Sequence, residues 1–264
     1  MPDERDALYV DQEYLRTVQY ATEHNLAARQ SIYAFQNPPV NLPSHVLDSL
    51  ELDGGEVVAD IGCGNGAYLA ELARRGHRGK VIGVDASPGM LAVCRPKAPS
   101  AALIAADAMA LPFRAGQVQV TLAMHMLYHL PDPRAALREL RRVTDGRVVV
   151  MLNYADHLAE LRLLIRAVMA ERGHEVGKAA TERLTVEDGA ELAAALFGNV
   201  DCRELATELR LPEPGPVAAY VASMGLGIDE AAQAQVAAEV AARADFATTG
   251  VFTVRTHCGW LVCG

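Results

Sequence analysis

The stretch "VVADIGCGNGAYLAEL", residues 57–72, constrains the fold of this chain more than any other. A short apolar run ends near Asp60, the glycines Gly62, Gly64 and Gly66 follow at alternate positions, and the next residues have helical spacing. Glycine is needed where the backbone takes a positive φ or where a ligand touches the main chain. A strand that passes through such a turn straight into a helix directs backbone N–H groups at the mouth of a sheet. The stretch therefore predicts a ligand site at a strand–turn–helix junction.

The same alternation continues as far as residue 153. Ser87 and Asp132 each precede a proline and a helical pattern, so both are predicted to be N-caps. Apolar runs of strand length occur at residues 57–61, 80–85, 101–107, 118–127 and 146–153. Strands and helices that alternate at this pace predict an α/β fold, with a doubly wound, mostly parallel sheet and helices on both faces.

The two ends of the chain have a different character. Residues 1–41 are amphipathic and helical in pattern and end at the breaker "NPPVNLP", so they are predicted to form an N-terminal helical lid. Residues 42–264 are predicted to form one ligand-binding domain with helical insertions at about 157–197 and 214–246. The alternating stretches "VDCRELATELRL" and "GVFTVRTHCGWLVC" are predicted to be strands, and the second is expected to close the sheet.

Charge and cysteine content narrow the environment and the partners. The formal net charge of −9 disfavours a nucleic-acid partner. The five cysteines include no CxxC pair, which favours reduced thiols. Because the N-terminus is polar and no apolar run is long enough to span a membrane, we expect a cytoplasmic protein without a membrane partner.

The acid at the start of the glycine turn separates two ligand classes. Gly62, Gly64 and Ala67 satisfy the dinucleotide pattern G-x-G-x-x-A. Asp60, however, would repel a pyrophosphate and would suit a ligand with a positive amino group, such as S-adenosylmethionine. The charge argument favours S-adenosylmethionine, while a dinucleotide site and a turn without a ligand remain as alternatives.

Two further acids close the next two apolar runs. Asp85 ends "VIGVD", where an acid accepts the hydroxyl groups of a ribose. Asp107 ends the third run, where its carboxylate and the N–H of Ala108 suit the adenine edge. The carboxyl ends of parallel strands form one crevice, so the three acids are predicted to share a single nucleoside site.

The motifs "VVADIGCGNGAYLAEL", "VIGVDASPGML", "AADAMALPF" and "VTLAMHMLYHLPDPRAALRELRRV" resemble those of the class I S-adenosylmethionine-dependent methyltransferases of the ubiquinone-biosynthesis-like type, over about residues 42–153. The resemblance implies a seven-stranded sheet with the last strand antiparallel. It also implies S-adenosylmethionine as cofactor and S-adenosylhomocysteine as product. The cofactor-binding residues are then Asp60, Gly62, Gly64, Asn65 and Gly66 for the methionine part, Asp85 and Ala86 for the ribose, Met90, Asp107 and Ala108 for the adenine, and Ala123 and Met124 flanking the ligand.

The histidines near the predicted crevice are the candidate catalytic residues. His125 and His129 follow the fourth run and His157 follows the fifth. A hydroxyl acceptor usually needs a base near neutral pH, whereas an amine needs only its neutral form. Each histidine has a structural alternative as a buried polar residue or cap, and the resemblance makes His129 more often structural than catalytic. No metal site is expected, because no third ligand accompanies the pair.

The N-terminal segment carries five aromatic residues in its first 35 positions. Arg29 and Tyr33 are candidates to reach the carboxylate of the methionine part from this segment. An aromatic, amphipathic segment can fold over a crevice as a lid. The equally supported alternative to a lid is a pair of helices that packs permanently against the sheet.

Together these observations predict a small-molecule methyltransferase with in-line transfer to an O, N or C nucleophile, of a kind found in secondary metabolism. The alternatives are a non-catalytic module that binds S-adenosylmethionine and, less favoured, an NAD(P)-dependent oxidoreductase. The sequence leaves the acceptor open, and it leaves the oligomeric state open between monomer and homodimer.

Overall fold

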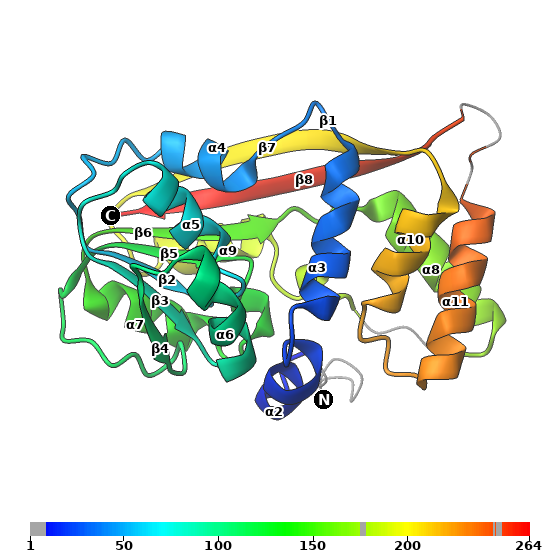
Figure 1. Cartoon of the computed structure of the whole chain (residues 1–264), viewed down its shortest axis with the longest axis horizontal. Helices are drawn as coiled ribbons and strands as arrows, with labels where there is room; N and C mark the ends of the chain where they lie inside the picture. The colour runs from blue at the N-terminus through cyan, green and yellow to red at the C-terminus, as the bar shows by residue number, and fades with distance from the viewer. Residues whose placement is uncertain (1–8, 175–177, 245, 247–249) are drawn as a thin grey trace.

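The computed structural model describes residues 9–174, 178–244, 246 and 250–264 (Figure 1). The part of the prediction that concerns residues 1–8 lies outside the described residues. An eight-stranded sheet runs through the molecule, in the order β1-β7-β8-β6-β5-β2-β3-β4. Within the described part of the chain, no helix has the length and apolar character needed to cross a membrane.

Seven of the eight strands match the predicted sheet. The strands are β2 (Val58–Ile61), β3 (Val81–Asp85), β4 (Ala102–Ala105), β5 (Val118–Met124), β6 (Thr144–Asn153), β7 (Val200–Leu211) and β8 (Phe252–Cys263). The first five pair in parallel, and β8 lies antiparallel between β6 and β7. The predicted α/β class and the antiparallel last strand are therefore confirmed.

The remaining strand, β1 (Gln36–Asn37), lies within residues 1–41, which were predicted to be helical. These two residues pair antiparallel with β7, so the N-terminal segment is not helical throughout. Before them come α2 (Gln12–Tyr14), the π-helix η1 (Leu15–Gln19), α3 (His24–Ser31) and the 3-10 helix η2 (Ile32–Phe35). The pairing anchors the end of the segment to the sheet.

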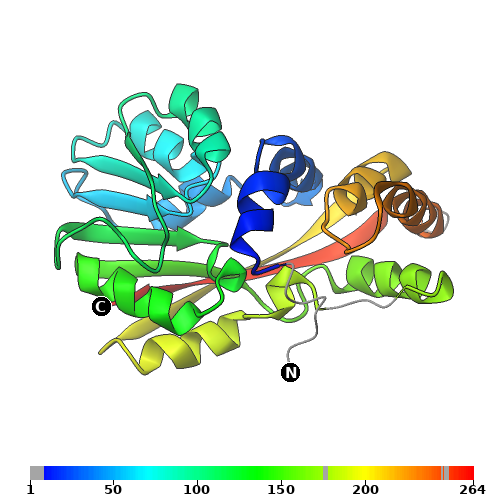
Figure 2. The same ribbon diagram turned by 90° about the horizontal axis from the view of Figure 1, so that it is seen from below.

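Two helix layers cover the sheet, one on each face (Figure 2). One layer holds α4 (Leu42–Asp48), α5 (Ala67–Arg74) and α6 (Pro88–Lys97), and the other holds α7 (Pro133–Val143) and α9 (Val186–Ala194). Alternate residues of β2 serve the two layers, because Val58 packs towards α4 and α5 while Ala59 and Ile61 pack on the other face. Ser87 and Asp132 cap α6 and α7 as predicted.

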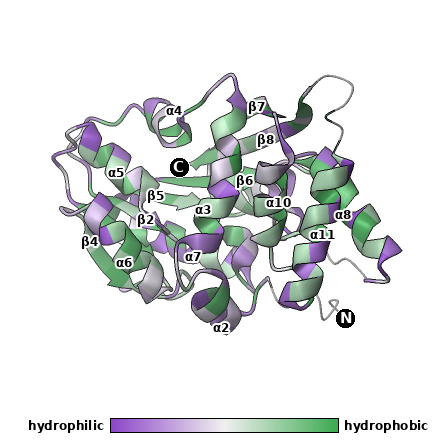
Figure 3. Ribbon diagram, turned by 45° about the vertical axis from the view of Figure 1, so that its right-hand side comes forward, coloured by the Kyte–Doolittle hydropathy of each residue, from purple (hydrophilic) through white to green (hydrophobic). Residues whose placement is uncertain are grey.

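The far ends of β7 and β8 carry a second group of helices. This group contains α8 (Ala159–Glu171), α10 (Pro214–Ala222) and α11 (Glu230–Arg243), and it has its own apolar core, which includes Ile32 of η2. Figure 3 shows hydrophobic residues on α8 and α11 of this group. The short helices η3 (Leu127–His129) and η4 (Ala180–Glu182) lie in the loops after β5 and α8. The predicted insertion 157–197 is thus divided, because α9 packs on the sheet while α8 joins the second group.

Candidate functional site

A cavity of about 490 Å³ opens at the carboxyl ends of β2, β3 and β5. One wall comes from the sheet, through the glycine turn and the loops that follow these strands. The opposite wall comes from the N-terminal segment, through α2, η1 and α3. Open α/β sheets bind ligands at this edge, and the volume falls in the range of small-molecule sites.

The glycine turn has the backbone geometry that only glycine adopts readily. Gly62, Gly64 and Gly66 have φ values of +70°, +53° and +79°. Space is also limiting, because a Cβ on Gly66 would lie 2.5 Å from Sγ of Cys94. Gly62 and Gly64 line the cavity, and Gly66 stands behind them as the N-cap of α5. The turn therefore brings main chain, free of side chains, to the ligand side.

Asp60 lies at the base of this turn. Its side chain is 1% exposed, and neither carboxylate oxygen has a hydrogen-bond partner among the described residues. Burial raises the pKa of Asp60 well above its usual range, and the neighbouring Cys94 and Asp85 act in the same direction. A buried carboxylate without a counter-charge is costly. The site is thus complementary to a cationic group that would occupy this end of the cavity.

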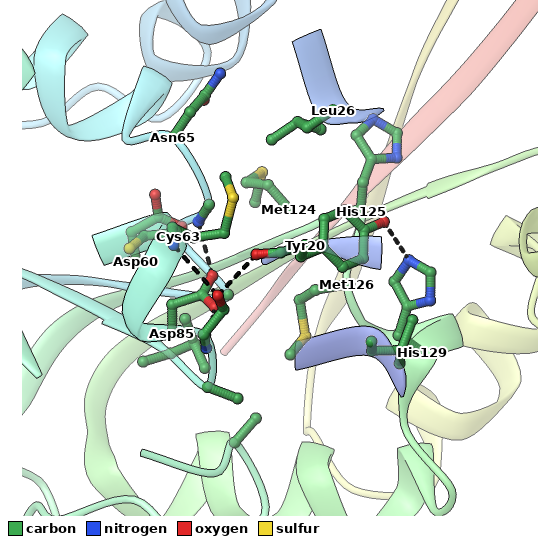
Figure 4. A pocket seen from close by; sticks show the side chains of 18 of the residues that line it. Tyr20, Leu26, Asp60, Cys63, Asn65, Asp85, Met124, His125, Met126 and His129 are labelled. Atoms are coloured by element: carbon green, nitrogen blue, oxygen red, sulfur yellow. Dashed lines mark hydrogen bonds between the residues drawn. The ribbon is translucent and has the colours of Figure 1, made fainter. Parts of the chain in front are cut away.

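Asp85 is held in place by two backbone donors. Its carboxylate accepts hydrogen bonds from the N–H of Gly64 at 2.9 Å and from the N–H of Ser87 at 2.8 Å. Burial raises the pKa of Asp85, and these two bonds oppose that rise. Asp85 therefore ties the glycine turn to the start of α6, with its carboxylate facing the cavity beside Asp60 (Figure 4).

The remaining predicted cofactor residues divide into two groups. Asn65, Ala86, Met90, Asp107, Ala108 and Met124 line the cavity with the acids. Ala123, in contrast, lies outside the lining and packs in the sheet core on the α7 side. Successive residues of a strand point to opposite faces of the sheet, so Met124 lines the cavity and its neighbour Ala123 does not.

The N-terminal segment is bound directly to the residues around the turn. The Ser87 hydroxyl donates to the carbonyl of Tyr20 at 2.8 Å, and Asn65 Nδ2 donates to Gln30 Oε1 at 2.8 Å. The Tyr20 ring then lies over the cavity, and its hydroxyl is 2.9 Å from His129 Nε2 (Figure 4). The segment is therefore one wall of the site in this structure.

Several lining residues of that wall have no local sequence signal. Gln12, Leu15, Arg16, Tyr20 and Leu26 come from the N-terminal segment, and no motif or spacing marks them. Only the high aromatic content of the segment hints at Tyr20. Their positions depend on contacts far apart in the sequence, such as the bond from Gln12 Nε2 to the carbonyl of His129 at 2.8 Å.

His125 and His129 both line the cavity, on the side away from Asp60 and Asp85 (Figure 4). His125 has a φ of +55°, which non-glycine residues adopt rarely and mostly at sites where surrounding structure enforces it. Its Nδ1 is buried without a partner among the described residues. Burial lowers the pKa of both histidines to about 4, so both rings are neutral at pH 7.

His157 and Tyr33 lie elsewhere and contact each other. The Tyr33 hydroxyl is 3.0 Å from His157 Nε2, and the backbone N–H of His257 donates to His157 Nδ1 at 3.0 Å. Neither residue lines the cavity, and Tyr33 packs against the core of the second helix group. Both ring nitrogens of His157 are engaged by these contacts, so neither His157 nor Tyr33 belongs to the proposed site.

The buried His157 predicts a pH dependence of stability. Burial, with smaller effects of His125 and Arg162, lowers its pKa to about 3 in the folded chain, from an ordinary value of 6.5. Between these values the unfolded chain binds a proton that the folded chain does not. The contribution to stability is therefore complete above about pH 6.5 and falls by about 1.4 kcal/mol per unit as the pH drops towards 3.

We expect the variant His157→Gln to have a shallower fall in unfolding free energy between pH 6.5 and 4 than the natural chain, measured by urea denaturation. Replacement of the exposed His24 by glutamine is the control for the loss of one imidazole. An equal slope in the natural chain and in His157→Gln would contradict the assignment.

Comparison with known proteins finds a family match for the middle of the chain, which includes the glycine turn. The family of methyltransferase domains matches residues 59–152. Residues 59–152 are therefore similar to a methyltransferase domain. The matched residues hold the glycine turn, the three acids and the two cavity histidines, so the family match and the cavity concern the same part of the chain.

Two curated relatives have names that describe them as methyltransferases of quinones. The demethylmenaquinone methyltransferase of Staphylococcus saprophyticus is 34% identical over 112 residues, which are 40% of this chain and 48% of that protein. The 2-phytyl-1,4-naphtoquinone methyltransferase of Thermosynechococcus vestitus is 34% identical over 111 residues, which are 40% of this chain and 49% of that protein. The chain thus spans about half the length of these relatives.

Solved structures share the fold at low identity. The YcgJ protein of Bacillus subtilis has a TM-score of 0.58 at 18% identity, with 84% of this chain and 97% of that chain covered. A protein solved in work on the conversion of a disulfide bond into a thioacetal group during echinomycin biosynthesis has a TM-score of 0.52 at 16% identity, with 84% and 81% covered. At these identities the likeness shows the fold.

The family implies S-adenosylmethionine as cofactor, and the residues of the methyltransferase domain fit this group. The buried, unpartnered carboxylate of Asp60 suits its ammonium group. The glycine turn leaves room against the main chain, because a Cβ on Gly64 would have its nearest neighbour, a side-chain atom of Leu26, at 3.6 Å. In the described part of the chain, no three His, Cys, Asp or Glu side chains lie together as a metal site would require.

Proposed function

We propose that the protein transfers a methyl group from S-adenosylmethionine to a small-molecule acceptor and releases S-adenosylhomocysteine. The observation that carries the proposal is the row of three acids, Asp60, Asp85 and Asp107, along one edge of the sheet and around one cavity. Carboxylates at this edge suit an amino group, a ribose and an adenine, and they disfavour phosphate.

Each acid has its own proposed role. Asp60 binds the ammonium group of the methionine part, since its two oxygens are buried and unpartnered. Asp85 accepts the ribose hydroxyls, and its bonds to Gly64 and Ser87 fix its orientation. Asp107 and the N–H of Ala108 bind the adenine edge, and Met90, which is 1% exposed, packs against the ring.

Bound S-adenosylmethionine supplies a methyl group on a positively charged sulfur. The chain's own contribution is to hold the acceptor in line with that carbon and to exclude water. Tyr20, Leu26 and Met124 cover the cavity with apolar surface. We propose that His125, with its unpartnered Nδ1, contacts the acceptor, whereas His129 positions the Tyr20 hydroxyl.

A small-molecule acceptor is favoured by the enclosure of the site. The N-terminal segment covers the cavity from the side opposite the sheet, and we propose that residues 1–41 act as its lid. The net charge of −9 gives no attraction for a polyanionic acceptor. The wider proposal is tested by incubating the protein with S-adenosylmethionine carrying a labelled methyl group and a panel of phenols, quinols, acids and amines. We expect S-adenosylhomocysteine to form with at least one member of the panel. If none of the panel leads to its formation, a module that binds S-adenosylmethionine without transfer would be favoured.

We expect Asp60→Asn to weaken the binding of S-adenosylhomocysteine by about tenfold or more, because a charge-assisted contact with the ammonium group is lost. The matched ligand is 5′-methylthioadenosine, which has the same adenosine and thioether but no amino or carboxyl group. Its dissociation constant is expected to stay unchanged in the variant. Isothermal titration calorimetry gives the dissociation constants of both ligands for the natural chain and for the variant. An equal loss of affinity for both ligands would remove Asp60 from the ammonium site.

A further inference from the structure

The charges around the cavity are segregated. All acids among the described lining residues are Asp60, Asp85 and Asp107, which lie on the proposed cofactor side. The opposite side holds two neutral histidines and two arginines, Arg16 and Arg29. A cationic acceptor would therefore find no counter-charge on the side left for it.

Arg29 has no carboxylate partner among the described residues. Arg16 pairs with Glu13 at 2.5 Å, so its charge is compensated. The Arg29 Nη1 donates to the carbonyl of Ser223 in the second helix group at 2.9 Å, which fixes the guanidinium. Its Nη2 is buried, with no hydrogen-bond partner among the described residues. A buried N–H without an acceptor is costly, so the site is complementary to an anionic oxygen.

Arg29 lies beside aromatic residues of the cavity. Its Cζ lies 5.2 Å from the centroid of the Tyr20 ring. Burial raises the pKa of Tyr20 and of Tyr128, and the charge of Arg29 opposes the rise in both, while Asp85 adds to the rise for Tyr20. The influences on the pKa of Asp60 come instead from burial, Cys94 and Asp85. Arg29 thus acts on the aromatic residues of the cavity. The sequence predicts a contact of Arg29 with the methionine carboxylate, and the test below separates that role from the one proposed here.

The other side chains beside Arg29 are aromatic. Tyr20 and Tyr128 present rings there, whereas Leu26 and Met126 lie against Gly64 and Gly62 of the glycine turn. Aromatic side chains pack well on flat, apolar molecules. The surroundings of Arg29 therefore suit a planar ring that carries one negative charge.

We propose that the acceptor is a planar aromatic anion, an aryl carboxylate or an acidic phenol that has lost its proton, and that Arg29 selects it. The inference rests on the proposed function, because it takes the acid-lined side of the cavity as the cofactor side. It names the chemical class of the acceptor and the residue that decides it.

The test uses full-length protein saturated with S-adenosylhomocysteine and three matched probes. The probes are 2-naphthoate, which is anionic, 2-naphthamide, its neutral analogue, and 2-(aminomethyl)naphthalene, which is cationic. Calorimetry at pH 7.5 is expected to show 2-naphthoate bound at least about tenfold more tightly than the amide, with the amine weakest. Equal affinities, or a preference for the amine, would overturn the proposal without any variant.

A second arm assigns the preference to Arg29. In Arg29→Gln, the preference for 2-naphthoate over the amide is expected to vanish, while the dissociation constant of S-adenosylhomocysteine stays unchanged. Arg29→Lys should retain part of the preference. Arg78→Gln, at an exposed position outside the cavity, makes the same change in net charge and should retain all of it. Circular dichroism confirms that each variant is folded.

The failures of the two proposals are distinguishable. If S-adenosylhomocysteine does not bind the natural protein, the proposed function fails. If it binds, and Arg29→Gln weakens it while 5′-methylthioadenosine and the naphthoate preference are unaffected, Arg29 serves the cofactor's carboxylate and the acceptor proposal is overturned.

Discussion

Asp85→Ala is expected to raise the dissociation constant of S-adenosylhomocysteine by more than about tenfold, because two charge-assisted bonds to the ribose are lost, each worth about 1.5–3 kcal/mol. The structure adds a second reason. The same carboxylate accepts the N–H of Gly64 at 2.9 Å and that of Ser87 at 2.8 Å, so its loss also frees the glycine turn. The expected loss of affinity is therefore larger than ribose contacts alone would cause.

Calorimetry with S-adenosylhomocysteine measures this effect. Asp85→Asn keeps one carbonyl oxygen and should lose less affinity than the alanine variant. Asp145→Ala, at an exposed position outside the cavity, is the control and should bind as the natural chain does. An unchanged dissociation constant in Asp85→Ala would remove Asp85 from the site.

Gly89→Ala is expected to displace the N-terminal segment and to weaken S-adenosylhomocysteine binding by about tenfold or more, since the covering wall of the cavity is lost. A Cβ on Gly89 would lie 2.0 Å from the carbonyl oxygen of Ala21. Gly89 lies in α6, and alanine favours a helix over glycine by about 1 kcal/mol. The helix is therefore expected to remain, and the contact with Ala21 to give way.

The displacement has a readout of its own. Hydrogen exchange in residues 9–35 should be faster in Gly89→Ala than in the natural chain, because their contacts with the rest of the site are loosened. Gly215→Ala, in α10, is the matched control, since a Cβ there has no neighbour within 4 Å. Natural affinity in Gly89→Ala, with unchanged exchange, would show that the segment is not needed to hold the cofactor.

The sheet and the cofactor side could be predicted because their signals are local. The turn at Gly62 and Gly64 needs glycine for its positive φ, and Asp60 and Asp85 are fixed by the strands that they end or nearly end. Parallel strands then bring these ends to one edge without further information. A short motif was therefore enough to place the acids together.

The acceptor side could not be predicted in the same way. Tyr33 was expected at the cavity and instead contacts His157, which lies 124 residues away in the sequence. Tyr20 takes the place over the cavity because Ser87 holds its carbonyl and His129 lies beside its hydroxyl. Such contacts depend on how the N-terminal segment packs, and no local pattern encodes that.

Local patterns also could not predict which hydrophobic core each helix of the C-terminal half joins. Helices α8 and α9 both read as amphipathic insertions, and each has an apolar face. Only the long strands β7 and β8, which reach both the sheet core and the second helix group, decide which core each helix joins. The pairing of β1 with β7 likewise depends on chain ends that are distant in the sequence.

One titration tests most directly whether this cavity accepts a cationic nucleoside rather than a pyrophosphate. The same preparation is titrated by calorimetry with S-adenosylmethionine, with S-adenosylhomocysteine and with NAD⁺. We expect one binding site for each of the first two ligands and no heat of binding for NAD⁺. Saturable binding of NAD⁺, with none for the two sulfur nucleosides, would contradict the account.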